Sequence, residues 1–261
     1  MKNKWPRISI VTPSLNQGNF IEFTIQSVLS QKYPNLEYLI VDGGSTDNTL
    51  SILKSFTGQV IWISEWDRGQ TDAINKGLKL ITGEIVAYLN ADDVLLPGSL
   101  DSVAKIFIEH PEVQWLSGKC KIIDDNGKDV RGAISTYKNL LLYSSSFHLL
   151  LITNYISQPA TFWRHDLLES CGLFDSNLNY VMDYEYWLRI WKKVAPPYMC
   201  YQDLAGFRIH HNSKTTSVGH LQDYIDEESL VVERYSPSTI WRRLHDIHRI
   251  LMTNAYRIMN H

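Results

Sequence analysis

Short apolar runs alternate with segments of helical spacing over the first third of the chain. The apolar runs predict strands at residues 7–12, 38–41, 60–63 and 85–90. The spacing between the runs predicts helices at residues 20–31 and 71–81, with a shorter helix between them that Ser45 or Thr46 can cap. This repeated strand–helix order predicts a mostly parallel, doubly wound sheet with helices on both faces.

The alternation is less regular after Pro97, a residue suited to the first turn of the helix that follows it. Helical spacing predicts helices at residues 99–109, 140–152 and 183–194. Strand-like runs lie at residues 114–123, 158–163 and 201–209, with a hairpin turn at 124–128. This half of the chain therefore predicts a mixture of strands and helices without a strict repeat.

A longer helical pattern starts at Ser238 and runs toward the last residue. Its apolar positions recur every three or four residues, at Ile240, Leu244, Ile247, Leu251, Ala255 and Ile258. The basic residues off this stripe are Arg242, Arg243, Arg249 and Arg257. Two interpretations are open: the helix packs on its own domain, or it is a basic amphipathic helix that rests on an anionic membrane or a partner.

Length and charge narrow the choice of protein class. The 261 residues suffice for one α/β domain with an appendage. The net charge of −3 gives no indication of a nucleic-acid partner. We find no apolar run long enough to span a bilayer and no signal segment at the N-terminus, so we expect a cytoplasmic protein. Its three widely separated cysteines, Cys120, Cys171 and Cys200, are then expected to be reduced and semi-buried thiols.

Polar residues collect where the predicted parallel strands end. Thr12, Pro13 and Ser14 follow the first strand, Asp42 the second, residues 65–67 the third, and Asp92-Asp93 the fourth. The carboxyl ends of parallel strands share one edge of the sheet, where open α/β sheets bind ligands. Adjacent carboxylates there favour a divalent metal that carries a diphosphate. Taken singly, Asp42 could make a turn and Asp93 could cap a helix.

Three common nucleotide or hydrolase motifs are absent from the sequence. No G-x-G-x-x-G follows the first strand, because residues 16–18 offer one glycine. The sequence has neither G-x-x-x-x-G-K nor G-x-S-x-G. A dinucleotide-binding protein is therefore a weak interpretation, and a P-loop protein is excluded.

Six segments, in order along the chain, resemble the large second family of glycosyltransferases. They are Ile10–Gly18, Ile40–Asp47, Leu89–Asp93, Gln158–Phe162, Met182–Arg189 and Phe207–His210. The resemblance covers roughly residues 6–215 and implies an inverting enzyme of the GT-A fold, with a Rossmann-like, mostly parallel sheet. It implies a glycosyltransferase domain at 1–215, with a nucleotide-binding half at 1–97 and an acceptor half at 98–215, and a C-terminal helical tail at 216–261.

The resemblance also implies the residues that carry the chemistry. Asp92 would hold the nucleotide ribose or share the metal, and Asp93 would bind Mg²⁺ or Mn²⁺ on the diphosphate of the donor. His210, or its neighbour His211, would complete the metal or phosphate site. Asp183 would be the general base that takes a proton from the acceptor hydroxyl, and it could equally be a helix N-cap.

Further positions would contact the two substrates. The nucleotide-sugar side would include Thr12, Pro13, Ser14, Asp42, Asp67 and Arg68, and the acceptor side Gln158, Trp163 and Glu185. Arg68 could instead pair with a surface acid, and Trp163 could belong to the core. The chain departs from many relatives in having Gly43 in place of a second Asp and Leu15 in place of Tyr, which leaves the nucleobase open.

These patterns predict an enzyme that moves a hexose from a nucleotide-diphosphate sugar to a hydroxyl of a glycan or lipid-linked acceptor. We expect inversion at the anomeric carbon and, for a lipid-linked acceptor, contact of the tail helix with the membrane. A sugar-nucleotide nucleotidyltransferase is an alternative, but the glycine- and basic-rich loop that it needs is missing at residues 16–20. A non-catalytic sugar-nucleotide binder is a third interpretation.

Overall fold

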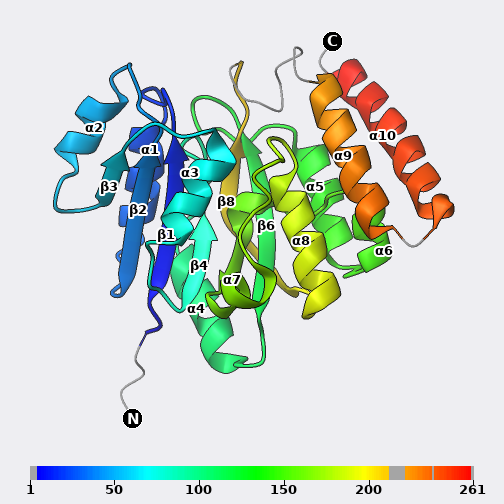
Figure 1. The fold of residues 1–261 in the computed structure, drawn as a ribbon, viewed down its shortest axis with the longest axis horizontal. Coiled ribbons are helices and arrows are strands. Elements are labelled where there is room, and N and C mark those ends of the chain that lie inside the picture. The colour runs from blue at the N-terminus through cyan, green and yellow to red at the C-terminus, as the bar shows by residue number, and fades with distance from the viewer. Residues whose placement is uncertain (1–4, 212–220, 237, 260–261) are drawn as a thin grey trace.

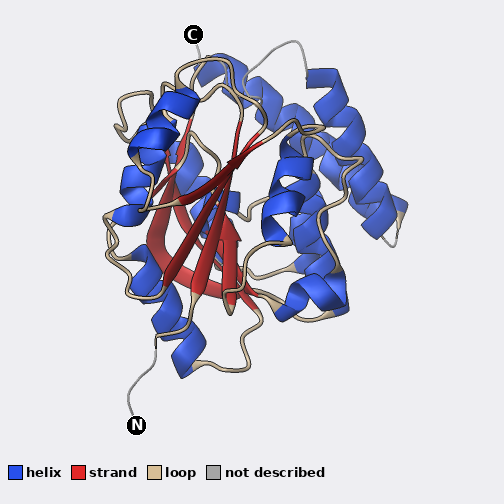
Figure 2. Cartoon of the chain, turned by 60° about the vertical axis from the view of Figure 1, so that its left-hand side comes forward, coloured by secondary structure: helices blue, strands red, loops and turns tan. Residues whose placement is uncertain are grey.

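The described chain folds around one mixed sheet with helices on both faces (Figures 1 and 2). The computed structural model describes residues 5–211, 221–236 and 238–259, with side chains as far as Met252. The strands are β1 Ile8–Ser14, β2 Leu36–Asp42, β3 Ile61–Ser64, β4 Ile85–Tyr88, β5 Val94–Leu95, β6 Trp115–Ile123, β7 Thr161–Arg164 and β8 Tyr198–Arg208. The α-helices are α1 Ile21–Leu29, α2 Thr49–Ser55, α3 Gln70–Leu78, α4 Ser99–Glu109, α5 Gly132–Leu142, α6 Phe147–Ile152, α7 Asp166–Cys171, α8 Met182–Lys193, α9 Leu221–Tyr235 and α10 Thr239–Met259.

The first half of the sheet is parallel, as the strand–helix alternation predicts. Within the described chain the strand order is β3-β2-β1-β4-β7-β6-β8-β5, and the first four strands run parallel. All seven residues of β1 are buried, because helices cover the sheet on both sides. Ser14, Asp42 and Ser64 lie in register at the carboxyl ends of β1, β2 and β3. The predicted gathering of strand ends at one edge is therefore confirmed.

The second half of the sheet is mixed. Strand β7 runs antiparallel to β4 and β6, β8 runs parallel to β6, and the short β5 pairs antiparallel with β8. The apolar pattern did not indicate β5, α7 or α9. The predicted helix at 140–152 covers the last three residues of α5 and all of α6, with a turn between them in which Ser145 has a φ of 39°, and the rest of α5 was not predicted. The run at 158–163 begins as a 3₁₀ turn at Gln158–Ala160 before β7 starts.

Two predicted helix starts are wrong. Helix α4 begins after Gly98, whose φ of 79° turns the chain, so Pro97 lies before the helix. Ser45 does not cap α2, because its hydroxyl donates to the carboxylate of Asp42. At both positions the backbone turn or the side-chain hydrogen bond decides where the helix begins, and the residue's own tendency to start a helix does not.

Apolar clusters pack against both faces of the sheet because successive strand residues point to opposite sides. In β1, Ile8 and Ile10 join one cluster and Val11 joins the other. All three cysteines are free and buried. The core beneath β6 and β7 contains large aromatic residues: the rings of Trp115 and Trp187 stack with centroids 5.6 Å apart.

Helices α9 and α10 lie side by side at one end of the molecule, next to α6 and α8 (Figure 1). The apolar stripe of α10 faces outward: Ile240, Ile247 and Leu251 are 65%, 55% and 62% exposed. The helix does pack on its own domain, against α6 and α9, but its apolar stripe is not the side that makes this contact. The inward side of α10 instead carries His245, His248 and Arg249, because it lines a polar cavity.

The predicted boundary at residue 215 lies outside the described residues, as do the side chains of Ala255, Arg257 and Ile258. Among the helices that the structure describes, none is long and apolar enough to cross a membrane.

Candidate active site

One large cavity opens at the carboxyl edge of the parallel strands. Its volume is about 1460 Å³, and its wall combines the ends of β1 and β4, the turn after β6, the start of α8, and residues of α5, α9 and α10. Pockets for one small ligand measure about 300–1,000 Å³. The cavity is thus large enough to hold two substrates side by side.

One end of the cavity, here called the Asp92 end, contains a carboxylate–imidazole pair. The Nε2 atom of His210 lies 3.0 Å from Oδ2 of Asp92. The ring of Phe20 packs on the His210 ring with centroids 4.4 Å apart, which fixes the imidazole. Two metal-type donors, from the segment after β8 and the turn after β4, therefore meet at the cavity wall.

Asp93 lies behind this wall and not on it. The side chain is completely buried, and its carboxylate accepts hydrogen bonds from the Arg208 backbone N–H at 2.9 Å and from Asn90 Nδ2 at 3.2 Å. Burial, together with the charge of Asp92, raises the pKa of Asp93 well above its usual range. The predicted contact between Asp93 and a bound metal does not agree with this geometry, in which Asp93 holds the end of β8 in place.

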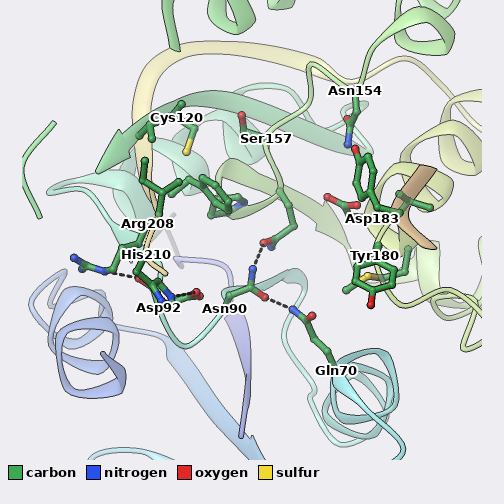
Figure 3. Close-up of a pocket in the computed structure, with 18 of the residues that line it drawn as sticks. Gln70, Asn90, Asp92, Cys120, Asn154, Ser157, Tyr180, Asp183, Arg208 and His210 are labelled. Atoms are coloured by element: carbon green, nitrogen blue, oxygen red, sulfur yellow. Dashed lines mark hydrogen bonds and ion pairs between the residues drawn. The ribbon is translucent and has the colours of Figure 1, made fainter. Parts of the chain in front are cut away.

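A chain of side-chain amides forms the middle of the cavity floor (Figure 3). Asn90 Nδ2 donates to Gln158 Oε1 at 3.2 Å, and Gln70 Nε2 donates to Asn90 Oδ1 at 2.7 Å. Gln158 is anchored in turn by donating to the backbone oxygen of Tyr88 at 2.6 Å. Gln158, predicted on the acceptor side, therefore lies at the centre of the cavity, and neither Asn90 nor Gln70 was singled out from the sequence.

Asp183 lies on the opposite side of this amide chain from Asp92 and His210 (Figure 3). It is the second residue of α8, and Val181 holds the N-cap position, so the N-cap interpretation is wrong. Its carboxylate accepts the Tyr184 N–H at 2.7 Å. Burial raises the pKa of Asp183 to about 6, while that hydrogen bond and the positive charge of Lys138 lower it. A carboxylate with this pKa can accept a proton near neutral pH.

Residues at the end of β1 and before α3 form the neighbouring wall. Pro13, Ser14 and Asp67 all line the cavity, as the sequence predicts. Ser14 Oγ is buried without a hydrogen-bond partner among the described residues. A Cβ atom on Gly43 would lie 2.5 Å from Asp67 Oδ2, so this glycine makes room for the Asp67 carboxylate.

Two predicted nucleotide-side residues support the strand ends from behind. Thr12 is buried and shares a hydrogen bond of 3.1 Å with the Tyr38 hydroxyl. Asp42 is also buried and accepts hydrogen bonds from Ser64 Oγ and from the backbone N–H groups of Gly44 and Ser45. Asp42 therefore has the turn-forming role that was its alternative interpretation. The side chains of Thr12 and Asp42 do not line the cavity wall.

Three further predicted residues also lie away from the cavity wall. Arg68 is exposed and pairs with Asp72, which was its alternative interpretation. Trp163 is fully buried in the aromatic core. Glu185 forms a buried ion pair with Arg189, at 2.5 Å, and accepts the Tyr235 hydroxyl at 2.6 Å. Glu185 therefore ties α8 to α9.

Comparisons with known proteins agree with this fold and cavity. Residues 9–170 match the glycosyl transferase family 2 domain. An uncharacterised glycosyltransferase of Rickettsia prowazekii is 28% identical over 226 residues, which cover 85% of this chain and 70% of the relative. The Escherichia coli UDP-Glc:alpha-D-GlcNAc-diphosphoundecaprenol beta-1,3-glucosyltransferase WfgD is 32% identical over 139 residues, 51% of this chain and 54% of the enzyme.

Two solved structures share the fold. S. aureus TarS in complex with UDP-GlcNAc superposes with a TM-score of 0.67 at 17% identity, covering 92% of this chain and 70% of the TarS chain. The Pyrobaculum calidifontis mannosyltransferase PcManGT, in complex with GDP-Man and Mn²⁺, gives a TM-score of 0.71 at 18% identity, covering 95% and 70%. The fold is therefore that of the GT-A glycosyltransferases. The chain belongs to glycosyl transferase family 2 and is a glycosyltransferase.

The buried position of Glu185 predicts a structural role for this side chain. We expect Glu185→Gln to lower the free energy of unfolding by about 3 kcal/mol, because the variant leaves the Arg189 guanidinium without its buried counter-charge. Urea unfolding measures the change. The matched control is Glu233→Gln, which breaks the exposed pair with Arg242 and should cost less than about 1 kcal/mol. Equal stability of the two variants would contradict the structural role.

Proposed function

We propose that this glycosyltransferase transfers a hexose with inversion, with a divalent metal at the Asp92 end of the cavity and Asp183 as the general base. The observation that carries the proposal is the placement of the two groups. Asp92 and His210 lie on one side of the Asn90 amide chain and Asp183 lies on the other. A sugar above Asn90 would then have its leaving diphosphate on one side and the attacking hydroxyl on the other, the arrangement that inverts the anomeric carbon.

The chemistry of Asp92 and His210 fits a metal that is shared with the substrate. No group of three or more His, Cys, Asp or Glu side chains suited to a metal occurs within the described residues. Mg²⁺ is commonly held by one or two carboxylates, with waters and substrate phosphates as further ligands. The pair could therefore hold Mg²⁺ or Mn²⁺ once a diphosphate supplies more oxygens. The bound metal would neutralise charge on the departing nucleoside diphosphate.

The similar proteins support a nucleotide-sugar donor. TarS is described with UDP-GlcNAc, and PcManGT with GDP-Man and Mn²⁺. Pro13, Ser14 and Asp67 line the same cavity and would meet the nucleotide. The acceptor, which we propose is a glycan or a lipid-linked glycan, would approach from the Asp183 side.

We propose a cytoplasmic enzyme that touches the membrane through α10. Its outward apolar stripe includes Ile240, Leu244, Ile247 and Leu251, and Arg243, next to this stripe, is exposed. Aliphatic side chains next to a cation suit the surface of an anionic bilayer. The three buried, unpaired cysteines fit a reducing compartment.

The first prediction tests donor binding at Asp92. Ligands that bind the native state raise the melting temperature by mass action. We expect one nucleoside diphosphate, or its sugar, to raise the melting temperature more with Mn²⁺ than without. Asp92→Asn should lose the Mn²⁺-dependent part of the shift, whereas Asp101→Asn, an exposed control on α4, should keep it. Retention of the full metal-dependent shift by Asp92→Asn would exclude Asp92 as a ligand.

The second prediction concerns Asp183. Asp183→Asn should reduce turnover by about 10²–10⁴-fold, because an amide cannot accept the proton, while the donor-induced melting shift survives. In the wild type, turnover should fall as the pH drops through about 6, where the carboxyl becomes protonated. The assay is release of the nucleoside diphosphate in the presence of acceptor glycans. Unchanged turnover in the variant would rule out Asp183 as the base, and donor binding without any wild-type turnover would favour a non-catalytic binder.

The third prediction tests the surface of α10. Replacing Ile247 and Leu251 together by Ser should reduce co-sedimentation with anionic liposomes several-fold, because about 0.8 kcal/mol is lost for each buried CH₂. The cavity-lining side of the helix is left intact. Leu80→Ser, which removes another exposed leucine, is the control. Equal sedimentation of the double variant and the wild type would remove the membrane proposal.

A further inference from the structure

Beyond Asp183 the cavity continues into a region between helices, here called the helical compartment. Its wall is formed by side chains of α5, α9 and α10 and by the segment after α6. The residues considered below are Ser135, Lys138, Asn154, Glu228 and His245. The part of this wall that comes from α9 and α10 lies outside residues 9–170, the part that matches the family domain. The family resemblance therefore assigns no role to α9 and α10.

Buried polar atoms without partners are concentrated in this compartment. Ser135 Oγ, Asn154 Oδ1, Glu228 Oε2 and His245 Nε2 are all buried without a hydrogen bond to any described residue. Most buried polar groups in proteins are hydrogen-bonded, and leaving one unpaired costs about 1–3 kcal/mol. Several such atoms around one cavity indicate a ligand rich in hydroxyl groups.

Glu228 and His245 are held so that each presents one atom to the compartment. His245 Nδ1 lies 3.1 Å from the backbone oxygen of Ile152, which makes Nδ1 the donor. Glu228 Oε1 accepts the Tyr224 hydroxyl at 3.2 Å. The remaining atoms, His245 Nε2 and Glu228 Oε2, lie 3.3 Å apart. These two atoms form an ion pair when the imidazole is protonated, and a sugar hydroxyl can bridge them because it donates to the carboxylate and accepts from the ring N–H.

Lys138 brings a positive charge into the same compartment. It is partly buried on the inner side of α5 and has no hydrogen bond or ion pair within 4.0 Å among the described residues. The carboxylates of Asp183 and Glu228 act on it only through space. Burying an ammonium group without a paired anion is unfavourable. Arg249, also on this wall, differs from Lys138 because it already pairs with Asp246 at 2.8 Å.

We propose that the helical compartment binds the acceptor, and that the acceptor is a sugar carrying an anionic group, a phosphate ester or a carboxylate, which pairs with Lys138. The hydroxyl groups of that sugar would meet Ser135, Glu228 and His245. This inference rests on the proposed glycosyl transfer and names the class of acceptor for the same site. Lys138 is a binding residue here, whereas Asp183 remains the base.

Acceptor binding tests the proposal separately from catalysis. The probes are a methyl hexoside, the same hexose as its 1-phosphate and 1-diphosphate, and the corresponding methyl hexuronide, titrated at pH 7.5 and followed by calorimetry. Comparison of the phosphate probes with the hexuronide shows which of the two anionic groups the compartment binds. We expect the wild type to bind at least one anionic probe about tenfold more tightly than the neutral hexoside.

Lys138→Met should lose this preference, with its affinity for the neutral hexoside unchanged, and Lys138→Arg should retain it. Lys105→Met, on the exposed side of α4, is the control and should behave as the wild type. Equal binding of neutral and anionic probes by the wild type, or a preference that survives in Lys138→Met, would overturn the proposal. Failure of the proposed function would appear separately, as a wild-type protein whose melting temperature no sugar nucleotide raises.

Discussion

The buried guanidinium of Arg208 holds together the elements on which the site depends. Its Nε donates to the backbone oxygen of Asp92 at 2.7 Å, and its NH1 donates to the backbone oxygens of Asp124 and Asp125 at 2.8 and 3.0 Å. Its own backbone N–H donates to Asp93. A buried guanidinium must satisfy its donors, so the turn after β4, the turn after β6 and the end of β8 are fixed relative to one another. His210, two residues further on, reaches Asp92 because of this anchor.

The cavity has two kinds of wall: one is formed by strand ends and the other by helices. The strand ends and the Asn90 amide chain provide a rigid floor, since each amide is anchored by a neighbour and Gln158 is anchored by the backbone of β4. The helices α5, α9 and α10 close the other side and carry buried polar atoms without partners. The residues of this floor lie within residues 9–170, which match the family domain, whereas α9 and α10 lie outside that match.

The cavity also determines which side of helix α10 faces outward. The inner side of α10 carries His245, His248 and Arg249, which line the cavity. Its aliphatic residues therefore lie on the outer side. An amphipathic helix on a soluble domain usually has the opposite orientation. The helical compartment and the proposed membrane contact are thus on two sides of one helix, which would bring a membrane-borne acceptor close to Asp183.

The sequence by itself determined the parallel half of the sheet and the gathering of Ser14, Asp67 and Asp92 at one edge, because apolar periodicity and chain order are local properties. The motifs also located Asp183 and His210 at the cavity. Only the tertiary structure decided that Asp92 faces the cavity while Asp93 lies behind it, that Glu185 pairs inside the core, and that the stripe of α10 points outward. Adjacent residues in a turn differ only in what packs against them, and periodicity reveals a stripe without saying which side of the helix is covered.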